Sequence, residues 1–347
     1  MENQPSALPY SPSWIDRFSD WVEKLPGPWW LFYVVLALAL VLFQSAVQWQ
    51  AGTYPIGTFD PFHVWFMVVI PYFLALLHYL NKSAEAALKT ARPSLNVNDA
   101  EYADLRYRLT HLPARPTLVS SLIAALSIIA AILLLGGEPE SLGFSSAPIS
   151  KTFLLFIWAV MWWIFGALFY QIAHQMRLIR RIYITHARVN LFQLTPLYAF
   201  SGVTARLAIG LTFQNYLWQV TYPQQANAGM NIGIGSFFAL VAIVVFVSPL
   251  WGLHQRLGAE KVRALNENGQ HFETATAALH RDVDAGNLEN STRLKDALTG
   301  LEIERNLLQK IPTWPWQPET LRGLITALLL PVVAFLIQFV LQRLLGK

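Results

Sequence analysis

Cysteine is absent from this sequence of 347 residues, and charged residues are scarce. Without cysteine, the chain forms no disulfide and performs no thiolate chemistry. Asp, Glu, Lys and Arg make up 13% of the residues, whereas a soluble domain contains about 25%. Apolar residues make up 54%, and they gather in runs of about twenty, the length that crosses a bilayer. Because these runs are continuous and not alternating, they predict an all-α polytopic protein of the plasma (inner) membrane.

The motifs of the common catalytic classes are also missing. The chain has no His-Glu-x-x-His, no P-loop, no Gly-x-Ser-x-Gly and no pair of aspartates within a span. We therefore expect no enzyme activity, no metal and no cofactor. A haem would need facing histidines at one depth, and His63, His78, His174 and His254 are better explained as interfacial residues. The net charge of +4 is spread through the loops, so we expect no nucleic-acid partner.

Seven segments are long enough to cross a bilayer. Six are clearly apolar: Trp29–Gln48, Pro61–Leu80, Leu118–Leu135, Thr152–Ile172, Ile234–Leu253 and Leu321–Leu341. The seventh, Pro196–Trp218, is less apolar and contains Arg206, the only charge deep in a span. Such a charge is either functional or reaches towards the cytoplasm or a neighbouring helix, and we favour the second explanation.

The distribution of Lys and Arg predicts the orientation. Basic residues concentrate in three connecting segments, with six in 82–116, four in 174–193 and eight in 254–318. Segments 49–60 and 219–233 contain none. Because basic loops stay in the cytoplasm, the fourth span ends inside and the sixth begins outside, so Pro196–Trp218 has to cross between them. We predict seven spans, with the N-terminus inside and the C-terminus outside.

The chain divides into four parts. Residues 1–28 form a polar cytoplasmic segment without the features of a cleavable signal. Residues 29–253 hold spans one to six with cytoplasmic extensions, 254–318 form a cytoplasmic helical hairpin that acts as an anchor, and 319–347 form the last membrane helix. The apolar periodicity after the fourth span predicts that this span continues without a break, as one helix of about forty residues, roughly 60 Å long, with no helix breaker before Pro196.

The hairpin is predicted from two apolar stripes. They lie on either side of Asp-Ala-Gly-Asn at 284–287, which is a turn sequence. The second stripe contains Leu294, Leu298, Leu301 and Leu308, and we expect it to form contacts between subunits. The proline-rich and tryptophan-rich run 312–318 ends the hairpin, because proline does not continue a helix.

Aromatic residues are dense in the outer halves of the spans. We expect a pocket for a small apolar or aromatic ligand there, lined by Phe62, Trp65, Phe66, Phe156, Trp158, Trp162 and Phe237. An interfacial aromatic belt in contact with lipid explains the same residues equally well.

The last span contains a primary amide within an apolar run. Gln338 lies beside Phe335, Phe339 and Gln342, which share one face of the predicted helix, and Val332 lies one turn earlier. In a symmetric oligomer, a ring of these helices satisfies the amide with water or ions, and the neighbouring apolar ring gates the pore. The alternative is a hydrogen bond between helices of one subunit.

Taken together, the topology resembles that of the insect olfactory and gustatory receptors and of the wider superfamily of seven-helix ion channels, which has prokaryotic relatives. Gustatory members carry Thr-Tyr, five apolar residues and Gln-Phe in the last helix. Here Pro331 and Val332 replace Thr-Tyr, whereas Gln338 and Phe339 match. The resemblance implies a homotetramer with the last helix around a central pore, and an anchor with Asn290–Lys310 at its core.

On this basis we expect a homotetrameric, ligand-gated, cation-conducting channel. Its partners are further copies of itself, the bilayer and a small apolar or aromatic ligand. Val332, Phe335, Gln338, Phe339 and Gln342 would form the pore and gate. The alternative is a membrane scaffold or sensor that conducts nothing and whose cytoplasmic hairpin binds a protein partner.

Overall fold

The computed structural model describes residues 9–135, 148–221, 228–286 and 288–344. Within this part of the chain, the named elements are all helices, so the predicted all-α class is confirmed. The α-helices are α1 Trp14–Glu23, α2 Trp29–Gln50, α3 Pro61–Ala91, α4 Asp99–Thr110, α5 Ala114–Leu135, α6 Pro148–Arg181, α7 Ala199–Thr221, α8 Ala228–Val247, α9 Trp251–Asp284, α10 Leu288–Lys310 and α11 Pro318–Leu344.

Among the described residues, four helical segments are long and apolar enough to cross a membrane. They are Trp29–Gln50, Pro61–Ser94, Ala114–Ile132 and Leu155–His186. A fifth is added if the pair Gly233–Val247 and Trp251–Asp284, bent by 45°, counts as one span. α7 and α11 also occupy positions where spans are predicted. The number of seven spans and the orientation therefore remain predictions.

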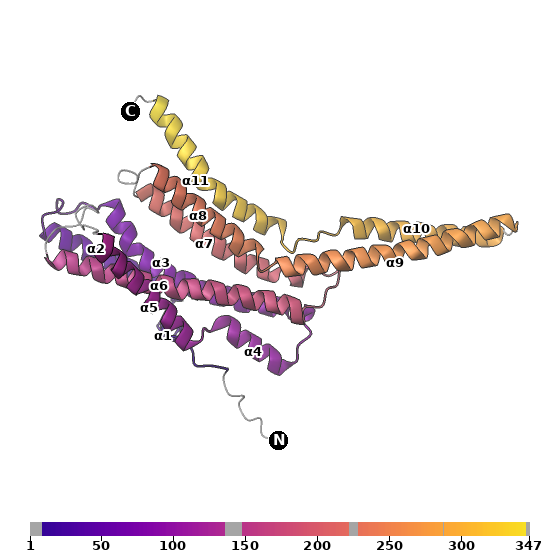
Figure 1. Cartoon of the computed structure of the whole chain (residues 1–347), viewed down its shortest axis with the longest axis horizontal. Helices are drawn as coiled ribbons and strands as arrows, with labels where there is room; N and C mark the ends of the chain where they lie inside the picture. The colour runs from indigo at the N-terminus through magenta and orange to yellow at the C-terminus, as the bar shows by residue number, and fades with distance from the viewer. Residues whose placement is uncertain (1–8, 136–147, 222–227, 287, 345–347) are drawn as a thin grey trace, which may run out of the picture.

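Helix α3 lies at the centre of the bundle and packs against α2, α6 and α7 (Figure 1). Asp60 begins it: the carboxylate accepts hydrogen bonds from the backbone N–H groups of Phe62 and His63, both at 3.0 Å. Pro61 occupies the first helical position, where no N–H is needed. Of the most apolar stretch of α3, 67% is buried, against 17% for α2. The outer helices therefore keep most of their apolar surface for lipid or for other chains.

Helices α5 and α6 approach each other closely at Gly166. A Cβ atom there would lie 2.4 Å from the backbone oxygen of Ser120. The Ser120 hydroxyl donates a hydrogen bond to the Gly166 oxygen at 2.7 Å. A small residue facing a hydroxyl is a common way to bring two membrane helices together.

The helix after the fourth predicted span is shorter at its C-terminal end than predicted. α6 continues through a π turn at Ile182–His186 and then stops at Ala187, well before Pro196. The chain pairs there with the connection between α3 and α4: the Asn96 N–H donates to the His186 oxygen, and the Arg188 N–H donates to the Ser94 oxygen, both at 2.7 Å. This tertiary pairing satisfies backbone groups that another helical turn would have used.

Arg206 lies on the exposed side of α7. Its guanidinium lies 5.9 Å from the centre of the Tyr79 ring on α3. The residue therefore contacts a neighbouring helix, which is one form of the structural explanation favoured above.

Helices α9 and α10 pack side by side and project away from the bundle (Figure 1). The turn between them contains Gly286 at a φ of 70°, which favours glycine. Lys261 of α9 donates from its ammonium group to the backbone oxygens of Gln309 and Ile311 at 2.7 and 2.8 Å, and so caps the end of α10. The buried Asn268 amide donates to the Leu301 oxygen at 3.0 Å and to the Glu304 carboxylate at 2.8 Å.

The segment between α10 and α11 is held by stacked rings. The His254 ring lies 3.9 Å from Trp314, Trp314 lies 4.4 Å from Trp316, and Trp316 lies 5.4 Å from Phe246, measured between ring centres. The three interplanar angles are 11°, 12° and 25°. The stack joins the bend between α8 and α9 to the start of α11 at Pro318. The tryptophans of this segment thus connect the hairpin to the last helix.

We expect Asn268→Ala to destabilise the hairpin by about 1–3 kcal/mol, because it removes the two hydrogen bonds that a buried amide donates to α10. The matched control is Asn266→Ala, which changes an exposed asparagine on the same helix. Urea-dependent proteolysis of the hairpin in the purified protein measures the difference. Equal resistance of the two variants would mean that the Asn268 amide does not hold α9 to α10.

Candidate functional site

The predicted ligand-binding aromatics fall into two groups. Phe62, Trp65 and Phe66 of α3 pack with Trp158 of α6: the Phe62 and Trp65 rings stack at 5.9 Å, and Phe66 lies 5.5 Å from Trp158. Phe62 is 6% exposed and Phe66 is 1% exposed. Trp162 joins the same core and contacts Phe165 at 5.7 Å. Five of the seven predicted residues therefore lie together as packed rings.

The other two predicted residues are not buried in this cluster. Phe156 is 62% exposed and Phe237 is 59% exposed in the single chain. A residue that sequence reasoning did not include, Trp218 of α7, takes part instead, with its ring 4.8 Å from that of Trp65. The indole N–H groups of Trp65 and Trp162 are buried without a hydrogen-bond acceptor. A ligand with an acceptor atom would satisfy them, and the role of the cluster in binding stays a prediction.

The predicted pore residues lie on α11, whose backbone is helical to Leu344. The side chains of Val332, Phe335, Gln338, Phe339 and Gln342 lie outside the part of the chain that the structure describes.

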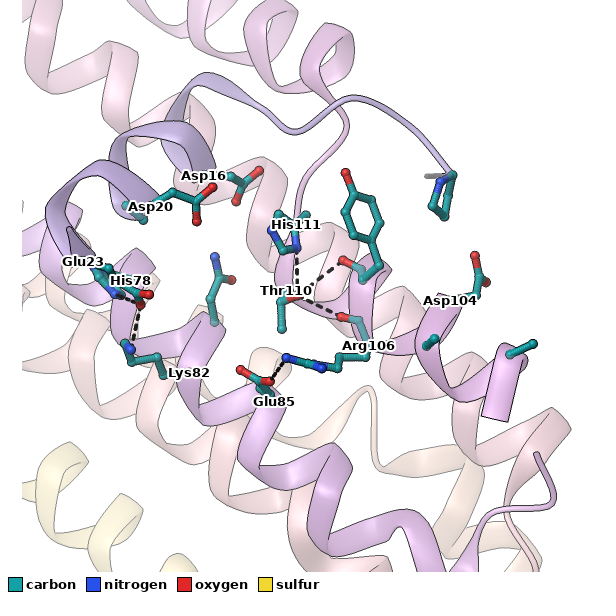
Figure 2. A pocket seen from close by; sticks show the side chains of 16 residues that line it. Asp16, Asp20, Glu23, His78, Lys82, Glu85, Asp104, Arg106, Thr110 and His111 are labelled. Carbon is teal, nitrogen blue, oxygen red and sulfur yellow. Dashed lines mark hydrogen bonds and ion pairs between the residues drawn. The ribbon is translucent and has the colours of Figure 1, made fainter. Parts of the chain in front are cut away.

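A polar cavity of about 530 Å³ lies at the other end of the bundle, between α1, α3 and α4 (Figure 2). It was not predicted, because residues 1–28 and the loop after the second span were not read as helices. Two capping boxes could have revealed them. Ser13 caps α1 with Asp16 three residues later, and Asn98 caps α4 with Glu101 three residues later.

Helix α1 is held over the cavity by a carboxylate with two partners. Oε1 of Glu23 lies 3.0 Å from Nε2 of His78 and 2.7 Å from the Lys82 ammonium, both on α3. The Tyr33 hydroxyl lies 3.0 Å from Nδ1 of His78. A histidine with its hydrogen on Nε2 satisfies both contacts, because it donates to Glu23 and accepts from Tyr33. The hydrogen bond from Lys82 is the main reason that the pKa of Glu23 is held below its ordinary value.

The pKa of Asp16 is shifted in the opposite direction. Its carboxyl is buried at 2% exposure, and burial raises its pKa above the ordinary value, although hydrogen bonds from Ser13 and Leu112 partly offset this. Asp20, one turn later on α1, is exposed at the cavity. Figure 2 shows Asp16 and Asp20 on one side of the cavity, and the ion pair of Glu85 with Arg106, at 2.6 Å, on the opposite side.

Comparison of the chain with protein-family models, with curated proteins and with solved structures finds no match. Within the described residues, no three His, Asp or Glu side chains are arranged to hold a metal ion.

We expect Phe66→Ala to destabilise the protein by about 3–5 kcal/mol, because it opens a hole in a packed core. Phe156→Ala removes the same ring from an exposed position and should cost less than about 0.5 kcal/mol. Thermal unfolding in detergent compares the two. If both variants have the melting temperature of the wild type, Phe66 lines an open space and is not part of the core.

The contacts of Glu23 with Lys82 and His78 predict that the stability of the fold depends on pH. A carboxyl with a lowered pKa stabilises the fold above its ordinary pKa of about 4.3, and this stabilisation is lost as the pH falls through the folded value. The effect should be below about 1 kcal/mol, because Glu23 is 46% exposed. Asp16, with its raised pKa, acts in the opposite direction, so the wild-type curve contains both contributions.

The melting temperature measured from about pH 6 to about pH 3 should therefore fall less in Glu23→Gln than in the wild type. Glu302→Gln removes an exposed carboxylate of α10 and serves as the control, with an unchanged slope. Parallel curves for Glu23→Gln and the wild type would show that the ion pairs of Glu23 contribute nothing to stability.

Proposed function

We propose that the chain is one subunit of a homotetrameric, ligand-gated, cation-conducting channel similar to the insect olfactory and gustatory receptors. In this proposal seven helices cross the membrane, the N-terminus is inside and the C-terminus outside, and α11 lines a central pore. The hairpin of α9 and α10 is the cytoplasmic anchor between subunits. The outer aromatic cluster receives a small apolar or aromatic ligand.

The observation that carries the proposal is the position of α11 at the edge of the bundle. It packs mainly against α7, through residues of its first half such as the buried Leu324 (Figure 1). Apolar side chains remain exposed along its length: Ile325, Leu329, Leu330, Val333, Ile337 and Val340. A helix of 27 residues whose described side chains are exposed at these six positions is available to meet further copies.

The connection of α11 to the rest of the chain supports the same proposal. The stack of His254, Trp314, Trp316 and Phe246 ties its first turn to the bend between α8 and α9. A movement of the hairpin or of α8 therefore reaches the start of α11 directly. A gated pore requires a coupling of this kind between the element that moves and the helix that lines the path.

A scaffold or sensor without a pore is the second candidate. It is favoured by the exposed apolar residues of the hairpin, namely Val262, Val283, Ile303 and Leu307. In that case the hairpin binds a protein of another kind, and α11 contacts only lipid. The two proposals differ in symmetry, since a pore needs a closed ring with α11 next to its axis.

We expect particle images of the purified protein to show four copies around such an axis, and liposomes to show cation flux that depends on α11. Phe339→Ala should raise resting flux, because removing a ring from each subunit widens and wets the constriction. Gln338→Glu should increase the preference for cations over anions, and Gln338→Lys should reverse it. The control is Phe213→Ala, an exposed ring on α7, which should leave flux unchanged.

A monomer, or a dimer with α11 facing lipid, would end the channel proposal. The same holds if assembled protein shows no change in flux with any of the α11 variants. Retention of a distinct soluble protein by the wild type, lost in Ile303→Asp, would then support the scaffold.

A further inference from the structure

We propose that the cavity between α1, α3 and α4 is a binding site for a small organic ammonium ion of the alkyl diamine class. The inference concerns binding at the polar end of the bundle, and it holds whether or not the chain conducts ions. It rests on the charges around the cavity and on one buried oxygen without a partner.

The lining of the cavity is acidic overall. Five carboxyl side chains line it, namely Asp16, Asp20, Glu23, Glu85 and Asp104, against the two permanent cations Lys82 and Arg106. His78, His111 and Tyr107 complete its titratable groups.

Three of the five carboxylates already have cations. Lys82 pairs with Glu23 at 2.7 Å, Arg106 pairs with Glu85 at 2.6 Å, and Arg108, which lies outside the lining, pairs with Asp104 at 2.8 Å. Among the described residues, Asp16 and Asp20 form no ion pair with Lys or Arg. Both belong to α1, four residues apart and thus on one face of the helix. The cavity therefore has uncompensated negative charge on its α1 side.

Asp16 provides the second, independent observation. Its Oδ2 accepts three hydrogen bonds, from the Ser13 N–H at 3.0 Å, the Ser13 hydroxyl at 2.7 Å and the Leu112 N–H at 2.8 Å. Its Oδ1 is buried without any partner, in a residue that is only 2% exposed. Leaving a buried acceptor unpaired costs about 1–3 kcal/mol. Asp16 also lines the cavity, so this oxygen is available to a hydrogen-bond donor that binds there while Oδ2 keeps its three partners.

An organic ammonium fits the site better than a metal ion. The described residues hold no group of three His, Asp or Glu side chains suited to a metal, whereas an ammonium is satisfied by one or two carboxylates and a ring face. The Tyr107 ring lines the cavity and stacks on His111 at 4.6 Å. Side chains four apart on a helix have Cβ atoms about 5–6 Å apart, which suits the two ends of a short diamine. The volume of about 530 Å³ lies within the range of small-molecule sites.

The test is thermal unfolding of the full-length protein in detergent with 1,4-diaminobutane at constant ionic strength. We expect a saturable rise in melting temperature, as for any ligand that binds the folded state. 1,4-Butanediol, which has the same length without charge, should give no rise. Asp20→Asn should weaken binding about tenfold or more, because a charged hydrogen-bond partner is lost. Asp296→Asn changes an exposed carboxylate on α10 and should leave binding unchanged.

A second pair of variants tests the location without changing any charge. Ala103 is exposed and lines the cavity, so Ala103→Trp should fill it and abolish the shift. Ala297→Trp, at an exposed position of α10, should keep the shift. The proposal is overturned if the wild type shows no saturable shift, if butanediol acts like the diamine, or if the shift survives both Asp20→Asn and Ala103→Trp. It is also overturned if magnesium chloride produces an Asp20-dependent shift and the diamine does not, because the site then binds a metal ion.

Discussion

The buried helix α3 fixes the positions of the other helices in the bundle. Its most apolar stretch is 67% buried, and α1, α2, α4, α6 and α7 all pack against it. A helix in a bilayer already satisfies its own backbone, so packing decides its position. Side chains such as Phe66, Phe73 and Leu80, each at most 1% exposed, fix where the neighbouring helices lie.

The side chains of α3 change from aromatic to polar along its length. The first turns carry the cluster of Phe62, Trp65 and Phe66, whereas later turns carry His78, Asn81, Lys82 and Glu85. These polar residues form hydrogen bonds and ion pairs with side chains of α1, α4 and α6. The Asn81 side chain accepts from the Gln171 and Gln175 amides of α6 at 2.9 and 3.2 Å. The polar cavity forms at this end because the short helices α1 and α4 bring further charges to it.

The remaining elements form a second unit attached to the central bundle. The bend between α8 and α9, the hairpin and α11 are joined by a ring stack and by the Lys261 cap. This arrangement explains the prolines and tryptophans before the last helix. The prolines end α10 and start α11, and the tryptophans hold the unwound segment against His254 and Phe246. The exposed apolar faces of α11 and of the hairpin belong to this unit, and they are the surfaces that the proposed assembly uses.

The helical class and the positions of the long helices follow from the amino-acid sequence alone. In a bilayer, an apolar run of about twenty residues satisfies its backbone hydrogen bonds by forming a helix. The sequence also places the turn at Gly286, because Asp-Ala-Gly-Asn interrupts both apolar stripes. The end of α6 was decided by tertiary structure: no breaker precedes Pro196, and only the pairing of Ala187 with Leu95 stops the helix. Tertiary structure also separated Phe156 and Phe237 from the other aromatics, since periodicity does not say which face meets a neighbour. The cavity depends most on tertiary structure, because Asp16, Lys82 and Arg106 are far apart in the chain and meet only when α1 and α4 fold onto α3.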